Sequence, residues 1–398
     1  MSVHIAQTPS FSVFSSNDVA PQSSLESVSA DLPNNVANND LRKINLLKLM
    51  STDIQSDDNS TIRSQIRSQI IAALQTHGYI LLTYPSSTSN QGSALGSALG
   101  SSTSKLHSAL LPPLHSTISS IKNLLTSPQN PWPPSSCPLT KGSVYFNENS
   151  TPMYKLGYDN GTGGTSDSHN TEDPIREYYR VSSKEPEGSG GFPSDKYGSR
   201  KFEIVRILNM CRHVCDCLLS QSLAVTVNRR HRNSGVRSWA EEEKVLRYEG
   251  EGGEDDYSIL YGMNYFNTVE AVEHARGQGN YGVKDGRLLN LKEHVDPSLW
   301  VLEPVLGDGV GGLEVWDERG EKWVLCDGVR SSLNDLLLPG EAAMVAFVGK
   351  GFAKTYSRMY PDAKEIKPTL HRVVAPREDE VGKERRSVIF EQKYGEYM

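Results

Sequence analysis

The 398-residue sequence has no apolar run approaching the roughly 20 residues that a membrane-spanning helix needs. Positive charge is also scarce, because 41 Lys and Arg stand against 48 Asp and Glu, giving a net charge of −7. Nucleic acids and anionic membrane surfaces attract basic proteins. We therefore expect neither nucleic acid nor membrane as a partner, and the basic run at 228–237 is interpreted as a solvated loop.

Cysteine is scarce too. The five cysteines are an odd number without the spacing of a disulfide framework, which indicates a reducing compartment. No Lys or Arg precedes Arg42, so neither a secretory signal nor a mitochondrial transit peptide is expected, although the serine-rich segment 10–16 leaves organelle import open. The sequence thus predicts a cytoplasmic protein, which we expect to be a monomer.

Composition divides the chain into three regions. Residues 1–43 form a Ser/Asn-rich tail that is expected to be disordered. Residues 44–240 are predicted to be mainly helical, with flexible insertions at 84–104 and 156–200. Residues 241–398 consist of short apolar segments separated by Gly, Asp and Pro, which is typical of a β-rich domain.

Periodicity predicts the individual elements. Helices are expected at 60–77, 114–126 and 200–225, and a strand at 79–84. Eight further strands follow at hairpin-like spacing, at 257–266, 287–295, 299–306, 311–317, 321–326, 342–349, 368–375 and 385–392. Because the predicted helices precede the predicted strands, we expect an α+β fold whose β-rich half is a sandwich or jelly-roll.

His294 and Asp296 stand one residue apart in the segment LKEHVDPSLW. Side chains two apart on a strand share a face, so these two are expected to project into the same space. His371, in another predicted strand, offers a second imidazole. If the two strands are neighbours, two histidines and one carboxylate form the facial triad that binds Fe(II) and leaves coordination positions open.

Arg385 and Ser387 stand two apart on the predicted strand that follows His371, and they also share a face. An inward guanidinium and hydroxyl are suited to gripping a carboxylate. A buried cation with no anionic partner would be strongly destabilising, so the sequence predicts a carboxylate ligand at this place.

The HxD pair, the segment GGLEV, the segment HRVV and the segment RRS occur in this order and together resemble the isopenicillin N synthase-like family of Fe(II)/2-oxoglutarate-dependent dioxygenases. The resemblance is strong over about 285–392 and weaker over 44–83. It implies a double-stranded β-helix (jelly-roll) core with N-terminal helices packed around it. It also implies an oxidoreductase that uses Fe(II), 2-oxoglutarate and dioxygen to hydroxylate, desaturate or cyclise a small organic molecule.

By this resemblance, the metal ligands are His294, Asp296 and His371, and Arg385 and Ser387 bind the distal carboxylate of 2-oxoglutarate. No catalytic residue beyond the metal centre is implied.

Two features depart from the family. Its members often carry an Asn-Tyr-Tyr segment whose second tyrosine helps to bind the oxoacid, whereas residues 264–266 read Asn-Tyr-Phe. Asn264 and Tyr265 are therefore candidates, with Tyr248 as an alternative donor. The stretch between Asp296 and His371 is also longer than usual, and the excess is assigned to surface loops or a lid at 326–340 and 357–368.

Two other functions remain open. An iron oxidase of isopenicillin N synthase type would use no 2-oxoglutarate, and Arg385 would then bind a substrate carboxylate. A non-catalytic jelly-roll binding module would carry the same residues without turnover. Succinate formation and dioxygen uptake distinguish these alternatives.

Other candidate sites are set aside. In CRHVCDC, Cys211 and Cys215 share the apolar face of the predicted helix and are interpreted as core residues, with His213 and Cys217 pointing elsewhere. The glycine-rich GDGVGG precedes a strand and has no P-loop lysine, so it is interpreted as a hairpin turn. The remaining histidines, such as His77, His115, His169 and His274, lack partners at ligand spacing.

Overall fold

The computed structural model describes residues 41–51, 60–86, 101–126, 143–145, 152–155, 157–159, 176–182, 198–225, 256–278, 283–284, 287–305, 309–375 and 377–394. Nearly all of the predicted tail lies outside these residues, as do the basic run, Tyr248, His169 and most of the insertion at 84–104.

Eight strands of the C-terminal region pair into two antiparallel layers. One layer contains β7 (Ile259–Tyr265), β10 (Trp300–Glu303), β13 (Glu341–Val348) and β15 (Arg385–Glu391), in the order β13-β10-β15-β7. The other contains β9 (Arg287–His294), β11 (Leu313–Asp317), β12 (Lys322–Leu325) and β14 (His371–Val374), in the order β12-β11-β14-β9. The chain crosses repeatedly between the layers, as in a jelly-roll. The fold is a double-stranded β-helix, and all eight predicted strands are confirmed.

Strands from the N-terminal region extend the larger sheet at both ends. β1 (Lys43–Asn45) and β2 (Tyr79–Pro85) join the larger sheet beside β13, and β6 (Arg176–Ser182) and β5 (Gly157–Asp159) join it beside β7. β8 (Val283–Lys284) pairs with β9 and extends the smaller sheet, and β3 (Ser143–Tyr145) and β4 (Pro152–Lys155) form a separate two-stranded sheet.

The prediction of a flexible insertion over 156–200 is wrong for its ordered segments. β5 and β6 lie within it, and helix α5 (Gly198–Leu223) begins before its end. The surrounding Gly, Ser and Asp residues obscured the strand-type segment REYYRVS. This error matters for function, because β6 carries a residue of the cavity described below.

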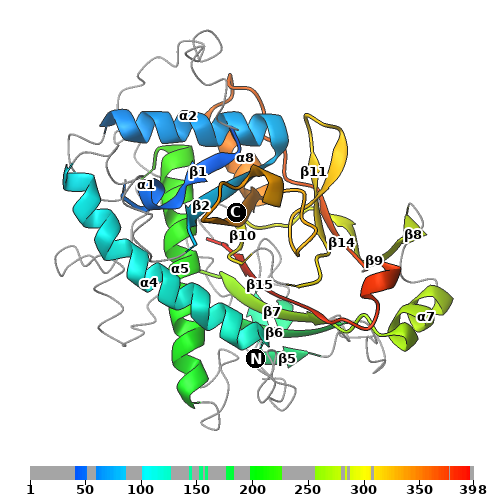
Figure 1. The fold of residues 1–398 in the computed structure, drawn as a ribbon. Coiled ribbons are helices and arrows are strands. Elements are labelled where there is room, and N and C mark those ends of the chain that lie inside the picture. Colours follow the sequence, from blue (N-terminus) through cyan, green and yellow to red (C-terminus); the bar gives the residue numbers. More distant parts are fainter. Residues whose placement is uncertain are drawn as a thin grey trace, which may run out of the picture. The chain divides into compact units, whose positions relative to one another are not determined.

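Four helices cover the outer face of the larger sheet, on the side away from β9 and β14 (Figure 1). They are α1 (Leu46–Ser51), α2 (Ser60–His77), α4 (Ser101–Thr126) and α5. The predicted helices are confirmed, although α4 begins at Ser101 rather than near residue 114. Cys211 and Cys215 on α5 are fully buried in the core, as predicted. No helix in the described ranges is both long and apolar enough to cross a membrane.

Two further helices lie between strands. α7 (Val269–Gln278) follows β7, and α8 (Lys350–Met359) follows β13. Short 3-10 turns occur at Asn334–Leu336 and Glu378–Glu380.

Strand alternation divides the side chains of β10 between two environments. Trp300 and Leu302 pack into the core shared with the helices, whereas Val301 belongs to the apolar cluster between the sheets. Glu303 faces the same interior as Val301, since it stands two residues further along. The fold thus places a carboxyl group inside an apolar space.

Candidate metal centre and its cavity

Three side chains meet at one end of the space between the sheets. His371 begins β14 and is paired with His294, the last residue of β9. Asp296 Oδ1 lies 3.5 Å from His294 Nε2, and Asp296 Oδ2 lies 3.3 Å from His371 Nε2. One ligand atom from each residue falls within 4.8 Å of the others, and in the described part of the chain this is the one group of its kind. The expectation that the two histidine strands are neighbours is confirmed.

Asp296 reaches this place for a different reason from the one the sequence indicates. β9 ends at His294, so Asp296 lies in the turn beyond the strand, where strand alternation does not apply. The turn is held by the start of α8, because the Lys350 amide donates to the Asp296 carbonyl oxygen at 2.8 Å. The backbone beside α8 therefore sets the position of the carboxylate.

Backbone carbonyls orient both imidazoles. His294 Nδ1 lies 2.8 Å from the Lys292 carbonyl oxygen, and His371 Nδ1 lies 3.2 Å from that of Thr369. A carbonyl oxygen only accepts, so Nδ1 carries a proton in each ring, and each Nε2 atom faces Asp296. Such support of the distal nitrogen is typical of metal-binding histidines.

The protonation states also suit a divalent cation. Burial raises the pKa of Asp296, but His371 and the hydrogen bond from His294 outweigh it and lower that pKa to about 2. Burial and the nearby His294 lower the pKa of His371. The pKa of His294 is raised, because Asp296 outweighs the opposing effect of burial. At neutral pH the centre offers an ionised carboxylate and a neutral His371 imidazole, the forms that bind metal. The donor set therefore fits ferrous iron.

Gly349 provides a test of how the Asp296 turn is positioned. A Cβ at residue 349 would lie 2.6 Å from the Asp296 carbonyl oxygen and 2.3 Å from that of Ser298, so Gly349→Ala must push the turn outward. We expect Fe(II) affinity to fall by about 10- to 100-fold, the range seen when ligand support is removed. Anaerobic Fe(II) titration measures it. Gly320→Ala is the control, because its Cβ would meet only the flexible Lys322 side chain; equal affinities of the two variants would contradict the prediction.

A cavity of about 280 Å³ opens onto the three metal-centre side chains. Most of its wall is apolar, formed by Leu291, Val301, Leu313, Phe347, Val373 and Ile389. The Phe347 ring packs against His371 with 4.8 Å between centroids. Polar groups enter from Arg180, Tyr261, Tyr265, Glu303 and Glu391. An apolar pocket with a few directed polar groups is typical of a small-molecule site.

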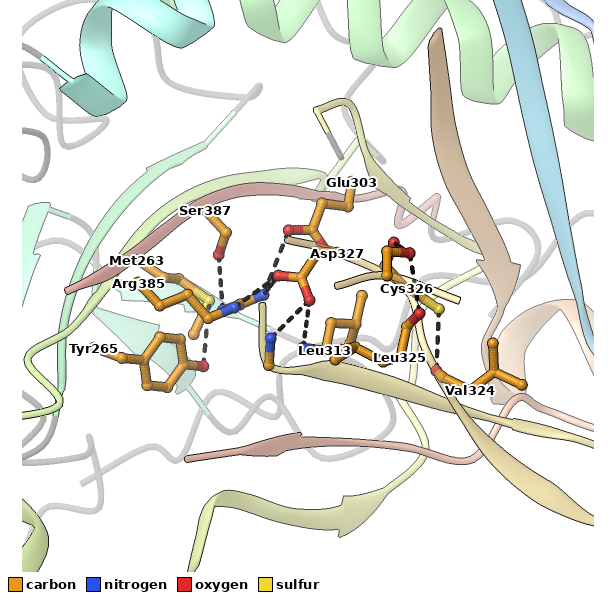
Figure 2. Close-up of polar contacts among 12 residues, drawn as sticks. Met263, Tyr265, Glu303, Leu313, Val324, Leu325, Cys326, Asp327, Arg385 and Ser387 are labelled. Atoms are coloured by element: carbon orange, nitrogen blue, oxygen red, sulfur yellow. Dashed lines mark hydrogen bonds and ion pairs between the residues drawn. The ribbon is translucent and has the colours of Figure 1, made fainter. Parts of the chain in front are cut away.

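The sequence implied that Arg385 has no anionic partner within the protein, but the structure pairs it with two carboxyl groups. Its Nε donates to Asp327 Oδ2 at 2.8 Å, and its Nη2 lies 2.6 Å from the same oxygen and 3.4 Å from Glu303 Oε1 (Figure 2). The guanidinium is 1% exposed. The premise of a buried cation without an anionic partner is therefore wrong, although Arg385 lies in the interior as predicted.

Asp327 is the centre of this arrangement. Its Oδ1 accepts the backbone amides of Gly312 and Leu313 at 2.7 and 2.8 Å, while Oδ2 takes the contacts of Arg385. The close approach requires glycine, since a Cβ at Gly311 would lie 2.1 Å from the Asp327 carbonyl oxygen. Asp327 belongs to the segment 326–340 that the sequence assigned to a surface loop or lid. That assignment fails for its first residues, because Cys326 and Asp327 are buried.

The buried charges shift one another's pKa values. Burial and the nearby Asp327 raise the pKa of Glu303 to about 8, despite the opposing effect of Arg385. Burial alone would lower the pKa of Arg385, but Asp327 and Glu303 raise it. At neutral pH these raised pKa values keep both the Arg385 guanidinium and the Glu303 carboxyl protonated.

The other predicted cosubstrate residues divide between two faces of the sheet. Ser387 Oγ lies 3.3 Å from Arg385 Nη1, and the Arg385 guanidinium lies 5.1 Å above the Tyr265 ring, which lines the cavity. The structure thus brings these three together. Asn264 points to the opposite face, where its Nδ2 donates to Glu177 Oε1 at 3.0 Å.

Polar residues at the metal end of the cavity were missed from the sequence. Arg180 on β6 stands opposite Tyr261 in the sheet register, with its guanidinium 5.9 Å from that ring. Glu391, at the end of β15, lies 2.5 Å from Lys393 Nζ, and burial raises its pKa. A charged residue within an otherwise apolar segment, such as Glu303 in VLEPV, was the sequence feature that could have indicated a polar group inside the cavity.

No family model matches the chain. No curated protein matches it either. Among solved structures, a full-length Neurospora crassa protein in complex with alpha-KG is 15% identical, with 88% of this chain and 84% of that one covered and a TM-score of 0.46. Dioxygenase for auxin oxidation 1 from Arabidopsis thaliana, in its 2-oxoglutarate complex, is 11% identical, with 83% and 89% covered and a TM-score of 0.41. Likeness at this level transfers neither activity nor substrate to this chain.

Proposed function

We propose that the protein is a non-haem Fe(II)/2-oxoglutarate-dependent dioxygenase that oxidises a small organic molecule. The observation that carries the proposal is the convergence of His294, Asp296 and His371 at the mouth of a cavity. These residues would hold the ferrous ion through two Nε2 atoms and a carboxylate, leaving positions open. A ferrous ion held there supplies the chemistry that couples oxidative decarboxylation of 2-oxoglutarate to oxidation of a C–H bond.

The distal carboxylate of the cosubstrate and the substrate bind near opposite ends of β15. Arg385 and Glu391 are six residues apart on this strand, which corresponds to about 20 Å. Glu391 lies near the metal centre, because its charge acts on both His294 and Asp296. Tyr265 and Glu303 line the cavity at its other end, the deep end, and Arg385 and Ser387 lie beside them. The distal carboxylate of the oxoacid binds there, while its oxo and C1 carboxylate groups reach the metal centre. The substrate binds at the metal end, beside Arg180 and Glu391.

The cavity wall contributes by excluding water. Apolar side chains form most of the cavity wall, the Phe347 ring packs against His371, and the imidazole of His371 is itself buried. Exclusion of bulk water strengthens the electrostatic contacts in the site and protects the oxidising reaction from side reactions.

Anaerobic titration of the Fe(II) protein with 2-oxoglutarate tests the proposal. We expect the weak visible charge-transfer band of a chelated oxoacid. Folded, iron-loaded protein that shows no band at any oxoacid concentration would overturn the proposal. Succinate formation during turnover excludes the oxoacid-independent iron oxidase, and substrate-dependent dioxygen uptake excludes the non-catalytic binding module.

Ser387→Ala tests the deep end without removing a charge. Ser387 Oγ lies 3.3 Å from Arg385 Nη1 and shares its face of β15, so we expect the hydroxyl to donate to the distal carboxylate. Loss of that hydrogen bond should raise the Kd for 2-oxoglutarate by about 5- to 10-fold, with Fe(II) affinity unchanged. Ser332→Ala, at an exposed position, is the control. Unchanged oxoacid affinity in Ser387→Ala would remove Ser387 from the site.

A further inference from the structure

One carboxyl oxygen in the deep end lacks a partner. Glu303 is 2% exposed and lines the cavity, and among the described residues nothing forms a hydrogen bond with its Oε2. Its other oxygen has only the long 3.4 Å contact with Arg385. A buried polar atom without a partner costs about 1–3 kcal/mol, so a bound group that completes its hydrogen bonding is favoured.

The charges around Arg385 limit which protonation state can accept an anion. One guanidinium faces Asp327 and Glu303, and the oxoacid would bring a third carboxyl group to the same end. Three ionised carboxylates around one cation would leave a net charge of −2 in a buried space, which is strongly unfavourable. At least one of the three groups must therefore carry a proton when the oxoacid is bound.

The contacts identify Glu303 as the group that carries it. Asp327 accepts two backbone amides and two N–H groups of Arg385, and each of these favours its ionised form. Glu303 has no comparable set of donors. The pKa of Glu303, raised to about 8 by burial and by Asp327, agrees with this assignment.

We propose that the protonated Glu303 carboxyl is a ligand of the cosubstrate: its Oε2–H donates a hydrogen bond to the distal carboxylate of 2-oxoglutarate, which Arg385 alone cannot neutralise because Asp327 already pairs with it. This inference rests on the proposed function. It predicts that cosubstrate binding requires one proton at Glu303, in addition to the contacts of Ser387 and Tyr265.

The groups that face Glu303 come from several elements. Arg385 and Ser387 lie on β15, Tyr265 on β7, and Cys326 and Asp327 follow β12. Burial raises the pKa values of Tyr265 and Cys326, and that of Arg385 is also raised, so these three keep their protons between pH 7 and pH 9. Glu303 is therefore the group of this cluster whose ionisation falls in that window.

The test measures the Kd for 2-oxoglutarate by the anaerobic Fe(II) charge-transfer band between pH 7 and pH 9.5. Binding to the protonated form is fully present below the pKa of about 8 and is lost as pH rises through it. The wild-type Kd should therefore rise by about tenfold from pH 7 to pH 9. In Glu303→Gln, whose amide keeps a donor and cannot ionise, the Kd should stay level. Glu303→Leu, which has no donor, should bind weakly at every pH.

A second ligand shows whether the titrating group lies near the distal carboxylate or near the metal centre. 2-Oxovalerate has the same chelating oxoacid group but no distal carboxylate, so its Kd should show no step near pH 8. A similar step for both ligands, or one that persists in Glu303→Gln, would place the titrating group elsewhere and overturn the role of Glu303. Wild-type protein that binds 2-oxoglutarate without pH dependence would overturn this inference alone. Absence of 2-oxoglutarate binding at every pH would instead overturn the proposed function.

Discussion

Replacing His371 with alanine should abolish ferrous-ion binding. His371 supplies one of the two imidazoles, and its ring is fixed by Phe347 at 4.8 Å between centroids and by the Thr369 carbonyl at 3.2 Å. Removing even a partner of a metal ligand weakens affinity by about 10- to 100-fold, so removing the ligand itself should exceed about 100-fold. Iron content after anaerobic loading and desalting measures this, and the oxoacid band should disappear with the metal.

His115→Ala is the matched control. His115 lies on α4, where its Nε2 is 2.6 Å from the Pro85 carbonyl oxygen, outside the cavity. This variant should retain wild-type iron content. Circular dichroism of both proteins separates loss of metal from loss of fold. A folded His371→Ala protein that binds Fe(II) with wild-type affinity would falsify the metal-centre assignment, and the proposed function with it.

Replacing Asp327 with alanine should destabilise the protein more than any other single change considered. The Arg385 guanidinium would lose its main partner while remaining buried, and removing one member of a buried ion pair costs about 3–5 kcal/mol. The Gly312 and Leu313 amides would also lose their acceptor. Glu303 would recover part of this loss by ionising beside Arg385. We therefore expect a loss of about 3–5 kcal/mol in the free energy of unfolding.

Urea-induced unfolding at pH 7 measures that loss, provided that the denaturant dependence of the transition is unchanged. Asp335→Ala is the control, because Asp335 is exposed and its substitution should change stability by less than about 0.5 kcal/mol. A loss below about 1 kcal/mol in Asp327→Ala would mean that the Arg385–Asp327 pair contributes little to the folded state.

The β-rich half could be predicted because its signals are local. Alternation of apolar and polar residues, with Gly, Asp and Pro between the segments, located all eight jelly-roll strands. β6 was missed because a short strand inside a Gly/Ser/Asp-rich region gives too few residues for alternation to stand out. α8 was missed because it has ten residues, and only two of its four buried residues, Phe352 and Tyr356, have large apolar side chains.

The site also contains residues that could be predicted from the sequence and residues that could not. His294, Asp296, His371, Arg385 and Ser387 could be proposed because their spacing is short and their order resembles a known family. Asp327 and Glu303 could not, because they meet Arg385 from 58 and 82 residues away and their roles depend on which strands lie side by side. An expectation based on Arg385 alone therefore assigned it a missing anion, when the fold already provides one.

The position of β15 affects how this chain can be completed during synthesis. β15 is made after every other strand of the two described sheets, yet it lies between β10 and β7 rather than at an edge. Until it emerges from the ribosome, β10 is paired only with β13 and β7 only with β6, so each has one open edge in the middle of the larger sheet. Exposed strand edges invite pairing with other chains. A truncated chain that ends before Arg385 would lack both the arginine proposed to bind the cosubstrate and the strand that joins β10 to β7.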